Sequence, residues 1–234
     1  MKRASVLRKM QLILGVLLFV GMLFSLYNVF IMVPTEQKMG IVQRIFYFHV
    51  PSAMMSFMAF FTVAGFSIAF LVKRNAWHDR VAVACAEIGV LFTTIALITG
   101  SIWARPIWNT WWSWDARLTT FLILWFIYIA YLMLRDYVGE DQRGARFAAV
   151  FAIIGTVDIP IVYFSIRWWR TLHPKPVLAG GEGSGLHPDM AFALYFSMAV
   201  FFILYLFLVA TRLRVENSKM ELEEIKRLHV LSTK

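Results

Sequence analysis

The chain has 234 residues, of which 60% are hydrophobic and only 16% charged, and its mean hydropathy is +0.67. A soluble domain of this composition would expose too little polar surface, so the composition predicts a protein that lies mostly in a membrane. The formal net charge of +9 does not indicate a nucleic-acid partner, because the basic residues lie between long apolar segments and form no stripe with interleaved aromatics.

Six segments are apolar enough to cross a membrane as helices of about 20 residues each. The first follows a basic N-terminus and resembles a signal peptide, but it is long enough to span and has no small-x-small cleavage site, so we expect a retained helix. The sequence therefore predicts an all-α, six-helix transmembrane bundle that forms one domain over residues 1–234. The predicted spans are approximately residues 11–33, 51–72, 81–103, 118–134, 145–166 and 190–211.

The distribution of basic residues predicts the orientation of this bundle. Sixteen of the 23 Lys and Arg residues lie at the two termini and in the connections on the same side as the termini. Because Lys and Arg are enriched in cytoplasmic loops, both termini are predicted to be cytoplasmic. The other three connections then lie on the outer, non-cytoplasmic face.

The single cysteine, Cys85, lies within an apolar segment. One cysteine excludes a disulfide framework, a cysteine-based zinc site and the C-x-x-C-H motif that attaches haem covalently. Any haem bound by this chain would be held without a thioether bond.

Tryptophan is concentrated on the predicted outer face, which holds seven of the nine Trp residues. Trp is common at both membrane interfaces, so a belt of interfacial aromatics should populate both faces. The one-sided distribution instead favours a platform for a large planar molecule such as a porphyrin or a quinone. If residues 108–115 are helical, one face carries Trp108, Trp111 or Trp112, and Asp115.

Three of the five histidines, His49, His173 and His187, are on the same face. A single interfacial histidine is more often a hydrogen-bonding residue than a ligand, but two imidazoles from different loops can bind haem iron from both sides. Pro51 suits the first turn of the second helix, which would place His49 just outside that helix. His187 follows a glycine-rich tract and is the weaker candidate.

Four arginines of the outer loops have two roles that the sequence does not separate. Their guanidinium groups suit the carboxylates of porphyrin propionates, and they suit lipid phosphates equally well. They are Arg105, Arg117, Arg167 and Arg170. Asp115 likewise has a structural alternative to ligand binding, as the cap of the following helix or as a partner of Arg117.

Two carboxylates, Glu87 and Asp158, lie within apolar segments, where an ionisable group is costly and suggests a function by default. No Lys or His lies at a matching depth, so a proton relay has little support. We expect structural hydrogen bonds, to a carbonyl freed by Pro160 or to a nearby threonine (Thr93, Thr94 or Thr156).

The motif Trp108-x-x-Trp111-Trp112-x-Trp114-Asp115-x-Arg117 resembles the W-W-x-W-D signature of the haem-handling membrane proteins of cytochrome c assembly. With six spans and this length, the chain is most similar to the haem exporter protein C family of the cytochrome c maturation system. The similarity extends over residues 44–51 and 160–173. The chain departs from the family pattern at Asn109, where glycine is common, at Asp158, where asparagine is usual, and at Pro174, where glutamine often follows the histidine.

The resemblance implies that His49 and His173 are the axial ligands of a non-covalent haem b. It implies a haem platform made by Trp108, Trp111, Trp112, Trp114 and Asp115. Such a protein would lie in a bacterial inner membrane and present haem at the outer face to a membrane-anchored haem chaperone. The implied partners are an ABC-type ATPase, its membrane subunit and a small single-span subunit; the chain has no P-loop of its own and is expected to deliver haem rather than to act as an enzyme.

Three other functions fit the sequence less well than haem delivery. A cytochrome c synthase of the second assembly system shares the tryptophan signature but should be longer, with further histidines inside its spans. A haem b or quinone electron-transfer subunit should carry its histidines within helices, and none of the predicted spans contains a histidine. A transporter that moves haem through its own core has little support from the few intramembrane polar residues.

Overall fold

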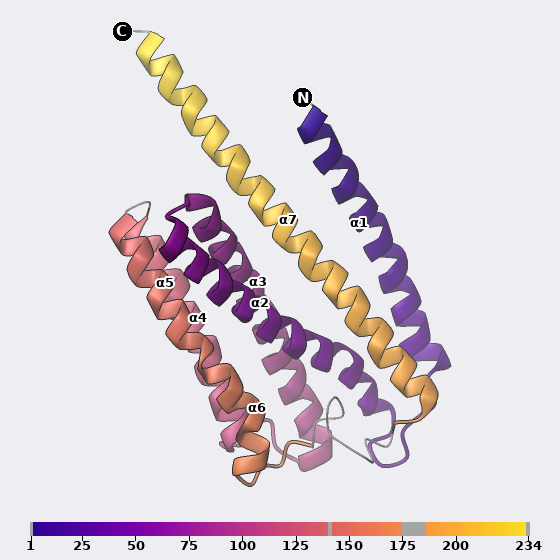
Figure 1. Cartoon of the computed structure of the whole chain (residues 1–234). Helices are drawn as coiled ribbons and strands as arrows, with labels where there is room; N and C mark the ends of the chain where they lie inside the picture. Colours follow the sequence, from indigo (N-terminus) through magenta and orange to yellow (C-terminus); the bar gives the residue numbers. More distant parts are fainter. Residues whose placement is uncertain (1, 140–141, 175–185, 233–234) are drawn as a thin grey trace.

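The computed structural model describes residues 2–139, 142–174 and 186–232, and within these residues it is helical, with no β-strand (Figure 1). Six helical segments are long and apolar enough to cross a membrane, which confirms the predicted all-α, six-span architecture. They cover Gln11–Met32, Ile41–Lys73, Ala76–Trp108, Ala116–Val138, Gln142–Trp168 and Pro188–Lys226.

Seven α-helices build these spans, because the fifth span consists of two helices. They are α1 (Lys2–Tyr27), α2 (Phe46–Lys73), α3 (Ala76–Trp108), α4 (Ala116–Val138), α5 (Gln142–Thr156), α6 (Asp158–Trp168) and α7 (Pro188–Ser232). A π-helical turn, η1 (Asn28–Met32), extends α1, and a 3-10 turn, η2 (Ile41–Ile45), leads into α2.

The helix ends follow from local residue chemistry. The side chains of Asn75 and Asp115 cap the starts of α3 and α4 by accepting a backbone N–H bond, at 2.9 and 3.0 Å. Residues with positive φ end α2 and α3, namely Arg74 (φ 56°) and Asn109 (φ 54°), and Gly139 (φ 54°) ends α4. Most spans are longer than predicted because the helices continue past their apolar segments.

Small residues allow the helices to approach closely, as is common in membrane proteins. A Cβ atom on Gly89 of α3 would lie 2.5 Å from the ring of Phe60 on α2. The Phe60 ring in turn stacks on Tyr128 of α4, with centroids 3.7 Å apart and planes within 8°. Helix α5 packs with a face of buried small residues: Gly144, Ala145, Ala148, Ala149, Ala152 and Gly155.

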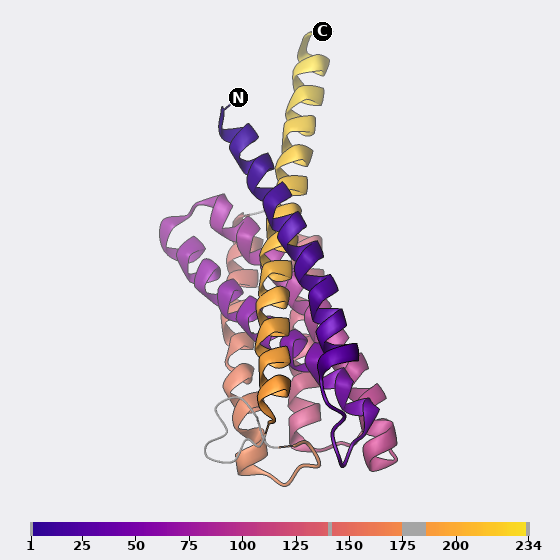
Figure 2. The same ribbon diagram turned by 90° about the vertical axis from the view of Figure 1, so that its right-hand side faces the viewer.

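Figures 1 and 2 show both chain ends at the same end of the bundle, where α1 and α7 extend beyond the other helices. The connections that follow η1 and α3, and the segment 169–174 that follows α6, lie at the opposite end, which we call the loop end. This arrangement agrees with the predicted alternation of connections. The side of the membrane to which each end belongs stays a prediction.

The two intramembrane carboxylates do not make the hydrogen bonds that the sequence predicted. Glu87 of α3 forms a two-pronged ion pair with Arg212 of α7, at 2.5 and 2.9 Å, and Arg212 also contacts Glu216 at 2.6 Å. This partner was missed because Arg212 was assigned to a tail beyond the last span, whereas α7 continues through it. Asp158 begins α6, and its Oδ2 atom is buried without a hydrogen-bond partner among the described residues.

We expect the substitution Gly89→Ala to lower the free energy of unfolding by about 1–3 kcal/mol, because the added methyl group forces the Phe60 ring away from its stack on Tyr128. Thermal unfolding in detergent, followed by circular dichroism, measures this change. Gly65→Ala is the matched control, since a Cβ at this exposed position of α2 meets nothing within 4 Å. Equal melting temperatures for the two variants would contradict the role given to Gly89.

Candidate functional site

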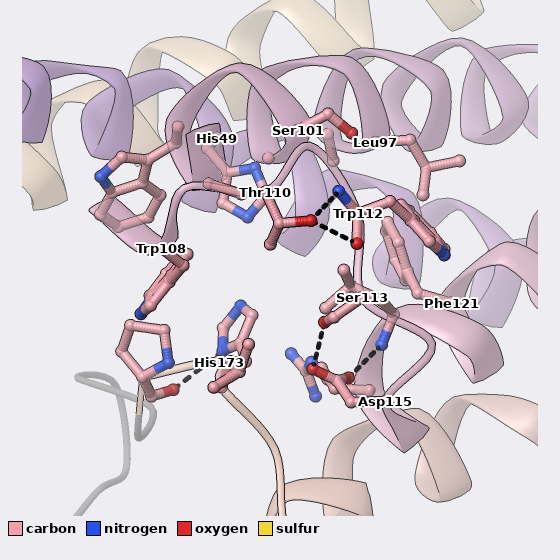
Figure 3. Close-up of a pocket in the computed structure, with 18 of the residues that line it drawn as sticks. His49, Leu97, Ser101, Trp108, Thr110, Trp112, Ser113, Asp115, Phe121 and His173 are labelled. Carbon is pink, nitrogen blue, oxygen red and sulfur yellow. Dashed lines mark hydrogen bonds between the residues drawn. The ribbon is translucent and has the colours of Figure 1, made fainter. Parts of the chain in front are cut away.

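A cavity opens at the loop end between α2, α3, the start of α4 and the segment 172–174 that follows α6 (Figure 3). The free space between its lining atoms is about 770 Å³, a volume that includes the open mouth. Its walls are mostly apolar and aromatic, and His49, Asp115, Arg117 and His173 are its ionisable residues. A few polar groups in an apolar pocket are typical of a ligand site.

His49 enters this cavity from the first turn of α2. The helix begins at Phe46 and not near Pro51, so the prediction that His49 lies just outside the helix was wrong. The helix extends upstream because Phe46 and Tyr47 are buried, with Phe46 packed against Trp103 of α3 at 6.1 Å. His49 therefore lies within the second span, contrary to the expectation that no span contains a histidine.

Thr99, Gly100 and Trp103 of α3 surround the His49 ring. Its Nδ1 atom is 3.1 Å from the hydroxyl oxygen of Thr99. The ring lies against Gly100, where a Cβ atom would be only 3.0 Å from the His49 Cε1 atom, and it meets the Trp103 ring edge to face at 5.9 Å. These contacts hold the imidazole on the α3 side of the cavity.

His173 enters from the opposite side, on the non-helical segment 169–174. Its backbone N–H donates to the Thr171 hydroxyl (3.0 Å), and its Nδ1 atom donates to the carbonyl oxygen of Pro174 (2.8 Å). Burial lowers the pKa of His173 to about 4, and the nearby Arg117 guanidinium acts in the same direction. The imidazole is therefore neutral at pH 7, which is the form that binds a metal.

Figure 3 shows the His49 and His173 rings on either side of the same open space. The Nδ1 atom of each ring has a protein partner, so the Nε2 atoms are the ring nitrogens left for a ligand. His187 is exposed, contacts Asp189 at 3.4 Å and does not line the cavity. The structure thus brings together two of the three histidines on the loop end.

The tryptophans divide into two groups. Trp103, Trp108 and Trp112 line the cavity together with Phe121 of α4, whereas Trp111 and Trp114 are 58% and 78% exposed and lie outside its lining. The Nε1 atoms of Trp103 and Trp112 are buried and have no hydrogen-bond partner among the described residues. Phe121 was not predicted as a site residue because it lies inside an apolar segment, and Trp103, one of the seven tryptophans predicted on the outer face, was not assigned to the haem platform.

The helical face considered for residues 108–115 does not form. Helix α3 ends at Trp108, and the chain turns at Asn109 and runs without helix to Asp115. The Thr110 hydroxyl donates to the carbonyl of Trp112 (2.8 Å), a local side-chain bond that competes with helix formation. Trp108 and Trp112 therefore line the same cavity because the chain turns at Asn109, and not because they lie on one face of a helix.

Asp115 connects the tryptophan segment to the histidine segment. It caps α4 and accepts a bond from the Ser113 hydroxyl at 3.0 Å. Although burial acts to raise the pKa of Asp115, its hydrogen bonds outweigh this and lower the pKa. The donors are the Leu118 N–H, the hydroxyls of Thr171 and Ser113, and the Leu172 N–H. The carboxylate therefore stays charged and holds the backbone next to His173.

Of the four arginines proposed for propionates, only Arg117 lines the cavity, and it also donates to the carbonyl of Val162 at 2.6 Å. Arg105 instead donates to the carbonyl of Asn109 at 2.8 Å, beyond the end of its own helix. Arg167 lies over the rings of Tyr163 and Phe164 at 5.7 Å. Arg170 is exposed outside the cavity lining.

The comparisons with known proteins agree on one family. A family model described as Heme exporter protein C matches residues 2–228. The Heme exporter protein C of Bradyrhizobium diazoefficiens is 39% identical over 78% of this chain and 70% of its own length. Those of Haemophilus influenzae and Escherichia coli K12 are each 36% identical, over 91% and 77% of this chain and 83% and 73% of their own lengths. The chain belongs to the haem exporter protein C family.

Two departures from the family pattern have a structural explanation. Asn109 has a φ of 54°, a conformation that glycine adopts freely and that asparagine tolerates better than most residues. Pro174 contributes its backbone carbonyl to His173, and glutamine would offer the same group. Neither departure removes a contact that the cavity depends on.

We expect Asp115→Ala to destabilise the protein by about 1 kcal/mol through loss of the α4 cap, and Asp115→Asn to cost less because asparagine is also a good cap. Thermal unfolding at pH 7 measures both. The folded-state pKa lies below the unfolded value of about 3.9, so the contribution of the wild-type carboxylate is present above that pH and is lost as the pH falls through the folded pKa. A wild-type advantage over Asp115→Ala that grew on acidification would contradict this account.

Proposed function

We propose that this protein binds haem b between His49 and His173 and delivers it during the maturation of c-type cytochromes. One observation carries the proposal: two imidazoles, from α2 and from the segment 169–174, line one cavity with their Nε2 atoms free. Haem iron accepts two such axial ligands, one on each face of the porphyrin. Membership of the haem exporter protein C family supports the same role.

The remaining residues of the cavity fit a porphyrin. Trp108, Trp112 and Phe121 offer large flat surfaces to its apolar faces, and the Arg117 guanidinium suits a propionate carboxylate. Trp111, Trp114 and the other three arginines lie outside this lining, so we assign them at most a role at the mouth. A ligand as wide as haem would extend from the cavity into its open mouth.

This exposed edge supports delivery over permanent binding. In the proposed mechanism the two imidazoles keep the iron coordinated, and the aromatic walls protect the porphyrin from aggregation. The open mouth leaves the porphyrin edge accessible, so that a histidine of a membrane-anchored haem chaperone can reach a vinyl group there. The chain supplies binding, orientation and access.

We further propose that the protein lies in a bacterial inner membrane with the cavity on the outer face. The support is the basic-residue distribution, with 16 of 23 Lys and Arg on the side of the termini, together with the position of the cavity at the opposite end of the bundle. The proposed partners besides the chaperone and membrane lipid are an ABC-type ATPase, its membrane subunit and a small single-span subunit. ATP hydrolysis would come from the ATPase, because the sequence contains no P-loop.

The geometry favours this role over an electron-transfer subunit. Such subunits hold haem between helices within the bilayer, whereas His173 lies outside the helices, on a loop at the end of the bundle. The cavity is also open at that end.

Substitution of either proposed ligand is the direct test. We expect His49→Ala and His173→Ala each to lose or strongly shift the Soret band of the protein purified with haem, because the iron loses an axial ligand. His187→Ala is the matched control, since His187 lies on the same end of the bundle but outside the cavity, and its spectrum should equal that of the wild type. Unchanged spectra for both cavity variants would rule out the proposed ligation.

Arg117→Gln should lower haem affinity by about tenfold, because a charge-assisted bond to a carboxylate contributes roughly 1.5–3 kcal/mol and glutamine restores part of it. Haem titration in detergent measures the affinity, and a melting temperature taken in parallel monitors the Arg117 bond to α6. Arg105→Gln is the control, because Arg105 contacts its own helix end. Equal losses for the two variants would contradict a specific role of Arg117.

A further inference from the structure

We propose that Thr99 is a positioning residue that fixes the tautomer of His49, and that Gly100 beside it fixes where the His49 ring lies. The inference rests on the proposed function, since it explains how His49 presents its Nε2 atom to haem iron. It is carried by three consecutive contacts: from Thr99 to its own helix, from His49 to Thr99, and from His49 to Gly100.

The hydrogen-bond direction at Thr99 follows from a count of protons. A hydroxyl carries one proton, and that of Thr99 donates to the carbonyl of Ile95 at 2.7 Å, with the Ala96 carbonyl as a longer acceptor at 3.3 Å. The Thr99 oxygen therefore has only lone pairs left for the His49 Nδ1 atom, 3.1 Å away. With the Thr99 hydroxyl donating to Ile95, His49 donates from Nδ1 and carries its proton there.

The position of that proton decides whether His49 can bind a metal into the cavity. In a neutral imidazole one nitrogen carries the proton and the other carries the lone pair. With Nδ1 protonated, the lone pair is on Nε2, for which the described residues provide no hydrogen bond.

Gly100 acts on the position of the ring and not on its tautomer. A Cβ atom at this residue would lie 3.0 Å from Cε1 and 3.5 Å from Nδ1 of His49, so the ring rests directly on the backbone of α3. Trp103, one turn further along, contacts the ring edge to face. Thr99, Gly100 and Trp103 lie on one face of α3 and together form a seat for His49.

The two histidines differ in how their tautomers are held. His173 donates from Nδ1 to a backbone carbonyl, that of Pro174, which no side-chain substitution removes. His49 donates to a side chain, so its tautomer is open to mutation. Partners of this kind orient metal-bound histidines, and their loss typically lowers metal affinity 10–100-fold.

The test compares Thr99→Val, which keeps the shape but removes the acceptor, with Thr99→Ser, which keeps the hydroxyl. The first readout is ¹⁵N NMR of the haem-free protein with labelled imidazoles, in which the His49 signals are assigned by their absence in His49→Ala. We expect Thr99→Val to increase the Nε2-protonated population of His49, and Thr99→Ser to keep the wild-type pattern. Haem titration is the second readout, with an expected affinity loss of about 10–100-fold for Thr99→Val and recovery in Thr99→Ser.

Two further variants separate the possible causes. Thr120→Val is the matched control, because the Thr120 hydroxyl bonds only to the carbonyls of Ala116 and Arg117 in its own helix among the contacts of the described residues. Gly100→Ala should weaken haem binding while His49 keeps its proton on Nδ1. If Thr99→Val folds poorly, Gly100→Ala still tests whether the contact between α3 and the His49 ring affects haem binding.

An unchanged His49 tautomer in Thr99→Val would overturn the inference, and so would a haem affinity equal to that of the wild type. A loss that Thr99→Ser does not recover would also overturn it, because it would show that packing and not the hydroxyl is responsible. If the wild-type protein itself bound no haem, the proposed function would fail, while the NMR comparison would still decide whether Thr99 sets the tautomer.

Discussion

The close contact between α2 and α3 is the constraint on which both the core and the site depend. Two ring side chains of α2, His49 and Phe60, are 11 residues apart, and the two glycines that receive them on α3, Gly100 and Gly89, are also 11 residues apart. Eleven residues are close to three helical turns, so both contacts lie on the same face of each antiparallel helix. Phe60 also stacks on Tyr128 of α4, and His49 lines the cavity. The packing that stabilises the bundle therefore also fixes the position of one proposed ligand.

The second proposed ligand is held by a different kind of interaction. His173 lies on a loop, and its place depends on hydrogen bonds: its backbone N–H donates to the Thr171 hydroxyl and its Nδ1 atom to the Pro174 carbonyl. Asp115 interacts with Thr171 and Leu172 of the same loop. Asp115 also caps α4, so the tryptophan segment and the histidine segment share one carboxylate. One imidazole thus sits on a pair of packed helices, and the other sits on a segment held by polar contacts. Segments of the second kind open at a lower free-energy cost than packed helices.

Hydropathy and charge were sufficient to predict the number of membrane spans, the all-α class and the alternation of connections, because these follow from the lipid environment. Helix ends were less accurate: α2 begins five residues before Pro51 because Phe46 and Tyr47 gain burial there. No local pattern could show this, since the burial is provided by Trp103 on another helix.

The two cavity histidines were predicted as a pair because their residue type itself carries the chemistry, and their role as haem ligands stays a prediction. Residues whose contribution depends on their place in the fold were not predicted. The sequence offered four equivalent arginines, and only the folded chain brings Arg117 to the cavity. Thr99 gave no signal at all, because a threonine in an apolar helix usually bonds to its own backbone, as this one also does. Its second contact, to His49, arises only from the α2–α3 packing.

The single guanidinium also bears on how haem would sit. Haem carries two propionates, and an unpaired carboxylate is costly to remove from water. Among the described residues that line the cavity, Arg117 is the only cation, and both imidazoles there leave Nδ1 as a donor to the protein and not to the ligand. In the proposed binding mode one propionate would pair inside with Arg117, and the other would remain in water at the mouth. The charge balance of the cavity thus leads to the same orientation as its shape, with one edge of the porphyrin inside and the other exposed for transfer.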